Sequence, residues 1–435
     1  MERKTVSVKE LPSLVGSRVA LRGWIWNRRG SGRIRFAQLR DGSGFAQLVA
    51  GEQDLDAESF DLLKRLSQES LVEAEGVVAE NAREPLGVEL RLSSIRKLSD
   101  SEDYPITHKE HGTDFLMDRR HLWLRSPRQR AILGVRDRVE RSIHDYFRDE
   151  GFLRVDAPIF TDNACEGTTT LFSADYFGSP AYLSQSGQLY MEAAAAAVGK
   201  AYCFGPTFRA ENSNTRRHLT EFWMVEPEAT FMELAGDMVL GEGLIRRIVS
   251  DVLADCASEL ALLGRDLTAL RATAACASFP RLSYDDAVEV LKKNGAPDFR
   301  WGDDFGGPHE TIIASQWSTP VIVHRYPCAC KAFYMKKDPA DARLSLSMDI
   351  LAPEGYGEIV GGGERETDLE TLLKGFERHG IAQTTLDWYL DLRKYGTFPH
   401  SGFGLGVERT LAWICGLPHV RETSPFPRLP GRLHP

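Results

Sequence analysis

The sequence lacks the features of a membrane or secreted protein. No apolar run approaches the roughly 20 residues that a membrane-spanning helix needs, and the charged beginning MERK is not followed by the apolar segment of a secretory signal. The seven cysteines are scattered and form no paired CxxC sets. Cys328 and Cys330 are one residue apart, which is poor geometry for a metal site on a strand. We therefore expect reduced thiols in a cytosolic protein.

An excess of positive charge, internal repeats and two common catalytic motifs are also missing. The formal net charge of -9 argues against a protein that coats nucleic acid indiscriminately. There is no Walker A pattern for nucleotide phosphates and no GxSxG pattern of a serine hydrolase. A chain of 435 residues exceeds the size at which single hydrophobic cores stop growing, so we expect two or three domains.

The N-terminal region reverses this acidic average. Residues 1–50 contain ten Lys and Arg against three Asp and Glu. Within them, RGWIWNRRGSGRIRFAQLRDGSGFAQLV reads as three strands separated by glycine-containing turns. A helical stretch and two further strand-like runs follow, at 55–66, 70–78 and 87–98. Five short strands, one helix and a basic front sheet predict an oligonucleotide-binding barrel over residues 1–102.

Two residues of this barrel are candidates for contact with an unpaired base. Phe36 offers an aromatic plate for stacking, and Gln47 offers an amide that can read a base edge. Two alternatives stay open at this stage. The arginines can be solvated side chains of a generic barrel, and Phe36 can belong to the core because Ile34 has the same strand parity.

The rest of the chain reads as a connector over 103–130 and a larger domain over 131–435. A helical pattern from 127 to 147 is followed by the strand-like GFLRVDAPIF. Helical patterns return as an insertion at about 231–275, and strand patterns reappear beyond residue 300. This order predicts an α+β fold.

The stretch from 209 to 228, RAENSNTRRHLTEFWMVEPE, reads as two β-arms joined by a turn. Alternate residues of a strand share a face, so one face of the second arm carries His218, Phe222 and Glu226. Phe222 and Glu226 would lie roughly 13 Å apart at about 3.3 Å per residue, which suits a long ligand such as an aminoacyl-adenylate. Arg209 and Glu211 offer a cation for phosphate and an acceptor for an amine. The alternative is a charged surface hairpin.

Two further segments carry residues suited to phosphate chemistry. Asp349 and Glu358 are hard oxygen ligands on neighbouring strand segments, and such pairs suit Mg²⁺ held jointly with substrate phosphates. Near the end, GFGLGVER reads as a glycine-spaced strand that enters a helix at about Val407 and stops at Gly416. Arg409 lies in the first turn of that helix, where the helix dipole already favours an anion.

Together these segments resemble the class II aminoacyl-tRNA synthetases of the aspartyl/asparaginyl subgroup, and most closely the asparaginyl-tRNA synthetases. GFLRVDAPIF is similar to the first, weak signature of that family, RAENSNTRRHLTEFWMVEPE to the second and GFGLGVER to the third. The likeness runs from the barrel near Val19 to FPRLPG at 426–431. It implies a five-stranded OB-fold barrel and a catalytic domain built on a mostly antiparallel sheet flanked by helices.

The resemblance also implies how ATP is held. Arg209 would bind the α-phosphate, and Glu211 the adenine amine. Adenine would lie between Phe222 and Arg409, which also reaches the γ-phosphate. Arg217 and His218 would hold the outer phosphates, and Asp349 and Glu358 would bind Mg²⁺. Glu358 also counts among the ATP ligands, which makes seven. The residues counted as catalytic would be Arg209, Glu358 and Arg409.

For the other substrates, the resemblance implies contacts in both domains. The amino-acid ammonium would meet Gln188, Glu226 and Glu166, with Arg365 at the side-chain end. The tRNA anticodon would meet Phe36, Gln47 and Glu89 in the barrel. The implied partners are ATP, L-asparagine, tRNA(Asn) and a second copy of the chain in a homodimer, with no membrane.

The choice between asparagine and aspartate depends on one position. Aspartyl relatives carry QSPQxxK, whose lysine pairs with the substrate's side-chain carboxylate, whereas this chain has Met191 where that lysine would stand. Methionine cannot balance a second buried charge, so binding aspartate would cost several kcal/mol in a dry site. The alternative is that Met191 is a core residue and another cation pairs with the carboxylate.

Three rival functions follow from the same segments. A relaxed aspartyl-tRNA synthetase disagrees with Met191. A tRNA-independent asparagine-forming ligase would not need the basic barrel with Phe36 and Gln47. A regulatory paralogue would be expected to lose the phosphate-binding residues, which are present here. The sequence therefore favours activation of asparagine and its transfer to tRNA(Asn).

Overall fold

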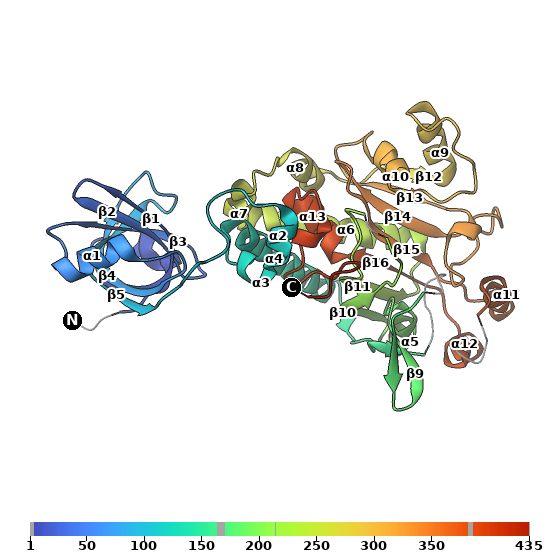
Figure 1. Ribbon diagram of the computed structural model, residues 1–435. Helices are drawn as coiled ribbons and strands as arrows, with labels where there is room; N and C mark the ends of the chain where they lie inside the picture. Colours follow the sequence, from blue (N-terminus) through green and yellow to red (C-terminus); the bar gives the residue numbers. More distant parts are fainter. Residues whose placement is uncertain (1–3, 163–169, 214, 382–385, 435) are drawn as a thin grey trace. The chain divides into compact units, whose positions relative to one another are not determined.

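The computed structural model describes residues 4–162, 170–213, 215–381 and 386–434. The chain divides into two compact units, Met1–Leu116 and Met117–Pro435, and Figure 1 labels the helices and strands of each. The boundary between the units falls inside the connector expected at 103–130, where two short helices lie, α2 (Thr113–Met117) and α3 (Arg120–Trp123).

The first unit is a closed five-stranded barrel with the strand order β1-β2-β3-β5-β4. Its interior is apolar, with Leu21, Leu39 and Leu48 fully buried. The helix α1 (Ala57–Arg65) begins after Asp56, whose carboxylate accepts a hydrogen bond from the Ser59 N–H at 2.7 Å, as an N-cap should. The prediction of an OB-fold barrel is confirmed. Its elements are η1 (Val8–Leu14), β1 (Arg18–Ser31), β2 (Ile34–Arg40), β3 (Phe45–Gly51), α1 (Ala57–Arg65), β4 (Leu71–Glu80) and β5 (Val88–Ser99).

The second unit is built on an eight-stranded sheet with the order β12-β13-β14-β15-β16-β11-β10-β6. Two neighbouring pairs, β12 with β13 and β10 with β6, are parallel, and the others are antiparallel, as expected. The strands are β6 (Leu153–Arg154), β10 (Lys200–Phe208), β11 (Glu221–Thr230), β12 (Arg281–Ser283), β13 (Val321–His324), β14 (Ser347–Ala352), β15 (Gly357–Glu364) and β16 (His400–Gly406).

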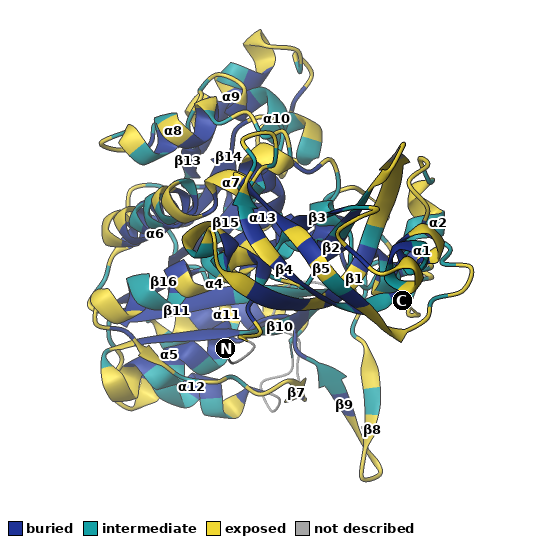
Figure 2. Ribbon diagram, turned by 90° about the vertical axis from the view of Figure 1, so that its left-hand side faces the viewer, coloured by how far each residue is buried: buried dark blue, intermediate teal, exposed yellow. Residues whose placement is uncertain are grey.

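Three helices pack on this sheet and share its main core: α4 (Pro127–Asp149), α6 (Leu234–Asp255) and α13 (Val407–Cys415). Figure 2 shows the central strands mostly as buried and the outer helix surfaces as exposed. Each helix end has a local cause. Ser126 caps the start of α4, where Pro127 needs no N–H partner, and α13 ends as expected at Gly416, which adopts the left-handed conformation with φ 67°.

The other elements lie around this core. Helices α5, α11 and α12 share a smaller core of their own, which includes Leu189, Phe376 and Tyr389. None of the helices within the described ranges is long and apolar enough to cross a membrane. These elements are β7 (Phe160–Thr161), β8 (Ser173–Tyr176), β9 (Ser179–Leu183), α5 (Gln188–Val198), α7 (Ala257–Leu262), α8 (Thr268–Ala275), α9 (Tyr284–Lys293), α10 (Gly307–Ala314), η2 (Cys328–Cys330), α11 (Leu369–His379), α12 (Asp387–Lys394) and η4 (Val420–Glu422).

Two half-buried histidines of the second unit predict a loss of stability in mild acid. Burial, together with the charges of Arg325 and Arg281, lowers the pKa of His324 to about 4. Burial and the charge of Arg421 lower the pKa of His419 to about 4. Unfolding restores a pKa of about 6.5. The unfolded chain therefore binds more protons below that pH, and stability present above pH 6.5 is lost as the pH falls toward 4.

We expect the free energy of unfolding to fall between pH 7 and pH 5 by on the order of 1 kcal/mol for each histidine, since partial exposure screens the effect. Chemical denaturation at the two pH values measures it. His419→Gln should remove part of the loss, whereas the same change at the exposed His121 should leave it unaltered. An equal pH dependence in all three proteins would contradict the assignment to His419.

Candidate active site

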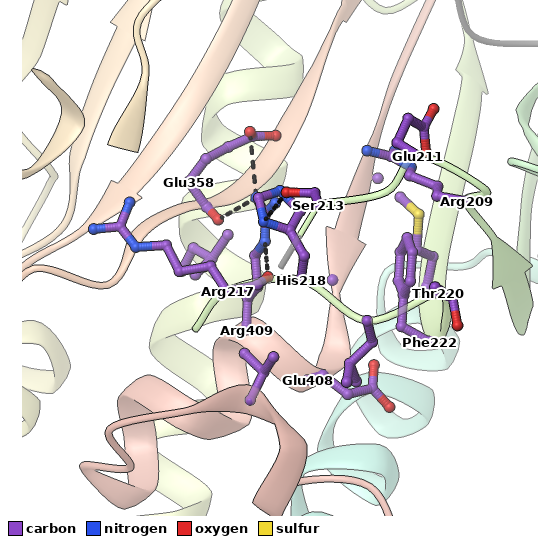
Figure 3. Close-up of a pocket in the computed structure, with 16 residues that line it drawn as sticks. Arg209, Glu211, Ser213, Arg217, His218, Thr220, Phe222, Glu358, Glu408 and Arg409 are labelled. Atoms are coloured by element: carbon purple, nitrogen blue, oxygen red, sulfur yellow. Dashed lines mark hydrogen bonds and ion pairs between the residues drawn. The ribbon is translucent and has the colours of Figure 1, made fainter. Parts of the chain in front are cut away.

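A cavity of about 330 Å³ opens over the central strands of the second unit. Figure 3 shows side chains from distant parts of the sequence turned toward it. The sequence-predicted residues that line it are Arg209, Glu211, Arg217, His218, Phe222, Glu358 and Arg409. The structure therefore brings together all seven residues that the sequence assigned to ATP. A charged hairpin on an open surface, the alternative for 209–228, does not describe this arrangement.

Strand pairing explains why these residues meet. The strand β16 lies between β11 and β15, and Leu405 of β16 pairs with Val225 of β11 and with Val360 of β15. Phe222 and Glu358 are thus carried on two strands that flank the GFGLG strand. A Cβ atom at Gly404 would overlap the Met224 side chain, so a larger residue would not fit there without displacing it.

Arg209 and Phe222 lie on opposite arms of the β10–β11 pair. The Arg209 guanidinium carbon is 5.4 Å from the centroid of the Phe222 ring, which is a cation–π distance. One prediction about this segment is wrong: the second strand does not run from His218. It begins at Glu221, which pairs with Phe208, because the Thr220 N–H donates instead to the Arg428 carbonyl.

His218 nevertheless lines the cavity from the connection between the two arms. Its Nδ1 lies 2.5 Å from the Thr215 hydroxyl and 3.3 Å from the Ser213 hydroxyl. Burial, with the positive charges of Arg409 and Arg209, lowers the pKa of this imidazole below its ordinary value. The ring is therefore neutral at pH 7, so it can donate a hydrogen bond to a phosphate but adds no charge.

Arg409 stands in the first turn of α13. Its Nη1 donates to the Glu358 carbonyl at 3.1 Å and lies 3.4 Å from the Glu358 carboxylate, as the dashed lines in Figure 3 mark. Burial alone would raise the pKa of Glu358, but Arg409, Lys331 and Arg209 together hold the pKa below its ordinary value. Glu358 is therefore ionised at neutral pH and available to a cation.

Arg217 is held by a residue that the sequence analysis missed. Glu310 of α10 receives its Nη1 at 2.9 Å, and the same Glu310 oxygen accepts the Glu358 N–H at 3.1 Å. Thr311 and Gly355 accept from the other guanidinium nitrogen at 2.8 and 2.5 Å. Burial, then the charge of Glu358, raises the pKa of Glu310 to about 7. No motif marks Glu310, because its role depends on contacts between distant segments.

The two carboxylates expected to bind Mg²⁺ converge on one point. Asp349 lies on β14 and Glu358 near the start of β15, and a Cβ at Gly361 would be 2.8 Å from Glu358 Oε1 and 3.3 Å from Asp349 Oδ1. Across the described parts of the chain, no group of three or more His, Cys, Asp and Glu forms an all-protein metal site. One or two carboxylates completed by phosphate oxygens is the donor set that Mg²⁺ takes, so the residues fit this ion.

The residues expected around the amino acid form a buried polar region. The Glu226 carboxylate accepts from the Ser186 hydroxyl and from the Gly187 N–H, the latter at 2.8 Å. Gln188, the first residue of α5, donates through Nε2 to Glu192 at 2.6 Å. Glu166 lies outside the described residues.

Glu192, which accepts from Gln188, also contacts three other polar side chains. It is fully buried and accepts from Arg393 at 2.7 Å and from the Tyr389 hydroxyl at 2.7 Å, and its carboxylate lies 2.9 Å from His400 Nε2. The arginine is the counter-charge that a buried carboxylate requires.

Arg365, expected at the side-chain end of the substrate, is paired with another carboxylate that the sequence analysis did not single out. Its Nη2 donates to Glu228 at 2.9 Å, and both side chains are almost entirely buried. Burial alone would lower the pKa of Arg365, but Glu228 raises it above its ordinary value. Glu228 is two residues from Glu226 on β11, so both carboxylates share a strand face.

Met191 is a core residue, as the alternative at that position allowed. It is buried and packs with Ala201 and Cys203. Arg365 is the cation expected at the side-chain end of the substrate, and Glu228 already neutralises it. A second carboxylate, that of aspartate, would meet a site whose charges are balanced.

In the barrel, the three residues expected to contact the anticodon are linked on one face. Arg29, which the sequence analysis did not select, lies 5.0 Å from the centroid of the Phe36 ring and donates to the side-chain amide oxygen Oε1 of Gln47 at 2.9 Å. Gln47 in turn donates to Glu89 at 3.2 Å. Phe36 and Gln47 also line a hollow of about 240 Å³. Phe36 is half-exposed and lies outside the barrel core, so the core alternative is wrong.

The sequence of this chain matches known protein families and relatives over its full length. Residues 112–430 match the class II tRNA synthetases (D, K and N), and residues 19–98 match the OB-fold nucleic acid binding domain. The asparagine–tRNA ligase of Sorangium cellulosum is 55% identical, with all of both chains covered. That of Desulforamulus reducens is 53% identical, covering 98% of this chain and 99% of the relative.

Among solved structures, the asparaginyl-tRNA synthetase of Pyrococcus horikoshii complexed with asparaginyl-adenylate superposes with a TM-score of 0.95. It is 41% identical, and the match covers 99% of this chain and all of that one. Since the family match spans most of the chain and full-length relatives share more than half of its residues, the chain belongs to the class II aminoacyl-tRNA synthetases and, within them, to the asparaginyl-tRNA synthetases.

Proposed function

We propose that this chain joins L-asparagine to ATP in the cavity of the second unit, forms asparaginyl-adenylate and releases pyrophosphate. It then transfers the asparaginyl group to the 3′ end of tRNA(Asn) and releases AMP. The observation that carries the proposal is that one cavity collects Arg209, Phe222, Glu358 and Arg409. A nucleotide needs a stacking plate, cations for its phosphates and a carboxylate for its metal, and these four residues supply each of them.

The reaction needs no protein nucleophile. The substrate carboxylate attacks the α-phosphorus in line, so the protein contributes positioning and stabilisation of charge. We assign Arg209 to the α-phosphate and Arg409 to the γ-phosphate, with Arg217 and neutral His218 at the outer phosphates. Asp349 and Glu358 would hold Mg²⁺, which when bound neutralises phosphate charge.

The base and the amino acid take the two ends of the cavity region. Adenine stacks on Phe222, and its amine donates to Glu211. The asparagine ammonium meets Glu226 and the side-chain amide oxygen of Gln188, whose Nε2 donates to Glu192. Glu166 belongs to the same proposed set.

Selection for asparagine is assigned to the Arg365–Glu228 pair. The amide of asparagine can donate its NH₂ to Glu228 and accept from Arg365, whereas aspartate would place a carboxylate against Glu228. ATP–pyrophosphate exchange measured separately with asparagine and with aspartate tests the proposal. We expect exchange with asparagine and little with aspartate. A preference for aspartate would contradict the assignment.

The anticodon residues give a prediction that separates tRNA binding from chemistry. Phe36→Ala should lower kcat/KM for tRNA charging by about 10- to 100-fold, because a stacked base contributes about 1–3 kcal/mol. Pyrophosphate exchange does not need tRNA and should stay normal. Ile34→Ala, at an exposed position of the same strand, is the matched control. If charging by the Phe36 variant equalled that of the wild type, Phe36 would not be a stacking residue.

Two further expectations concern the protein in the cell. We expect a homodimer, which light scattering on the purified chain measures, and a cytosolic location with reduced cysteines, which thiol labelling of freshly lysed cells measures.

A further inference from the structure

Lys331 forms an ion pair with Asp349, one of the two carboxylates proposed to bind Mg²⁺. Lys331 Nζ donates to both oxygens of Asp349, at 2.8 and 2.7 Å. The same ammonium lies 3.8 Å from the centroid of the Tyr326 ring. Both members of the ion pair are largely buried, with 16% of the lysine side chain and 11% of the aspartate side chain exposed. The cation is thus fixed between a carboxylate and an aromatic face.

Other negative charges surround the same ammonium. Glu358 and Asp304 both act on Lys331 electrostatically. Glu358 and Asp349 also converge over Gly361, where no side chain fills the space between them. Lys331 therefore places a positive charge of the protein beside the point where the divalent ion is expected.

A divalent ion and this ammonium compete for Asp349, because both are cations and both are attracted to the same carboxylate. Each Asp349 oxygen within reach of a metal is engaged by Lys331, so the metal has to displace the ammonium or lie beside a like charge. The phosphates of ATP change this balance because they add negative charge and oxygen ligands for both cations. Lys331 has three donors on a flexible stem and can turn from Asp349 to a phosphate oxygen.

We propose that Lys331 is an internal cation of the metal site, which holds Asp349 in place while no nucleotide is bound and makes divalent-ion binding depend on the phosphates of ATP. The inference rests on the proposed function of this cavity. Lys331 would act before the chemistry: it keeps the free enzyme from binding the metal alone, and it is the counter-ion of the largely buried Asp349 carboxylate.

The test uses Mn²⁺ as a visible substitute for Mg²⁺, with the full chain and no nucleotide. Electron paramagnetic resonance measures free Mn²⁺ in a titration of the wild type and of Lys331→Met, which keeps the length of the side chain but removes its charge. We expect the variant to bind Mn²⁺ at least about tenfold more tightly than the wild type, because the competing cation is gone. Lys331→Arg keeps the charge and should bind as weakly as the wild type.

A double variant shows whether the added Mn²⁺ affinity depends on Asp349. Lys331→Met combined with Asp349→Asn should lose the added Mn²⁺ affinity. Tighter binding that survives the Asp349 change, or no tighter binding in Lys331→Met, would overturn the proposal. Lys331→Gln is a second uncharged variant held to the same expectation if the methionine variant does not fold. Asparagine-dependent exchange by the wild type tests the proposed function separately, because the Mn²⁺ titration contains no substrate.

Discussion

Arg209→Ala is expected to reduce asparagine-dependent ATP–pyrophosphate exchange by more than about 100-fold, a barrier increase of about 3 kcal/mol. The arginine is preorganised: its guanidinium lies over the Phe222 ring, in the cavity that collects the other candidate phosphate ligands. Negative charge develops on the α-phosphate oxygens as the pentavalent arrangement forms. A fixed cation at that point stabilises the transition state more than the ground state, so kcat should fall more than the apparent affinity for ATP.

Two control variants show whether the loss of exchange in Arg209→Ala is specific to this guanidinium. Arg209→Lys keeps a charge but loses the planar fork, so it should fall between the wild type and the alanine variant. Arg271→Ala, at an exposed position on α8, should exchange normally. Equal unfolding curves for all variants exclude a general loss of structure. Near-normal exchange by Arg209→Ala would remove Arg209 from its proposed role and, with it, the main support for the phosphate assignments.

The sequence predicted which residues meet in the cavity because they lie in short contiguous segments. Arg209, Glu211 and Phe222 fall within one motif, and Arg409 falls within another, so their relative order is visible without a structure. What joins them is the pairing of β11, β16 and β15, which no local pattern specifies. A glycine-spaced strand does indicate that something passes close to its backbone, and Gly404 agrees with that reading.

Residues that act by holding another residue were not predictable in the same way. Glu310, Lys331 and Glu228 each pair with a side chain 93, 18 or 137 positions away. A lone Glu or Lys in such a segment reads as a solvated surface charge, and only tertiary contacts show that it is buried. Arg29 was missed for the same reason, since nothing in a run of basic residues distinguishes the one that contacts Phe36.

Comparing Met191 with the lysine of the aspartyl relatives favours asparagine, but Met191 itself explains only part of that preference. The absence of lysine there does argue against a bound second carboxylate, but the residue itself packs in the core. The pair expected at the side-chain end of the substrate is Arg365 with Glu228, which are 2% and 0% exposed. In the proposed function, discrimination between asparagine and aspartate follows from Glu228, whose carboxylate attracts an amide NH₂ and repels a second carboxylate.

Removing the Glu228 carboxylate is expected to have the second large effect on activity. Glu228→Gln is close to isosteric but leaves Arg365 buried without its counter-charge. Loss of an acceptor for the substrate amide should lower kcat/KM for asparagine by about 100-fold, in line with about 3 kcal/mol for one partner of a buried charged pair. Aspartate can now supply the missing negative charge, so the asparagine-to-aspartate ratio in pyrophosphate exchange should narrow by more than about tenfold.

Glu364→Gln is the matched control, because Glu364 is also a buried carboxylate and is paired with Lys336 near the end of β15. It should lower the free energy of unfolding without altering the ratio. If both variants changed the ratio equally, or if Glu228→Gln left it at the wild-type value, selection would lie elsewhere in the pocket.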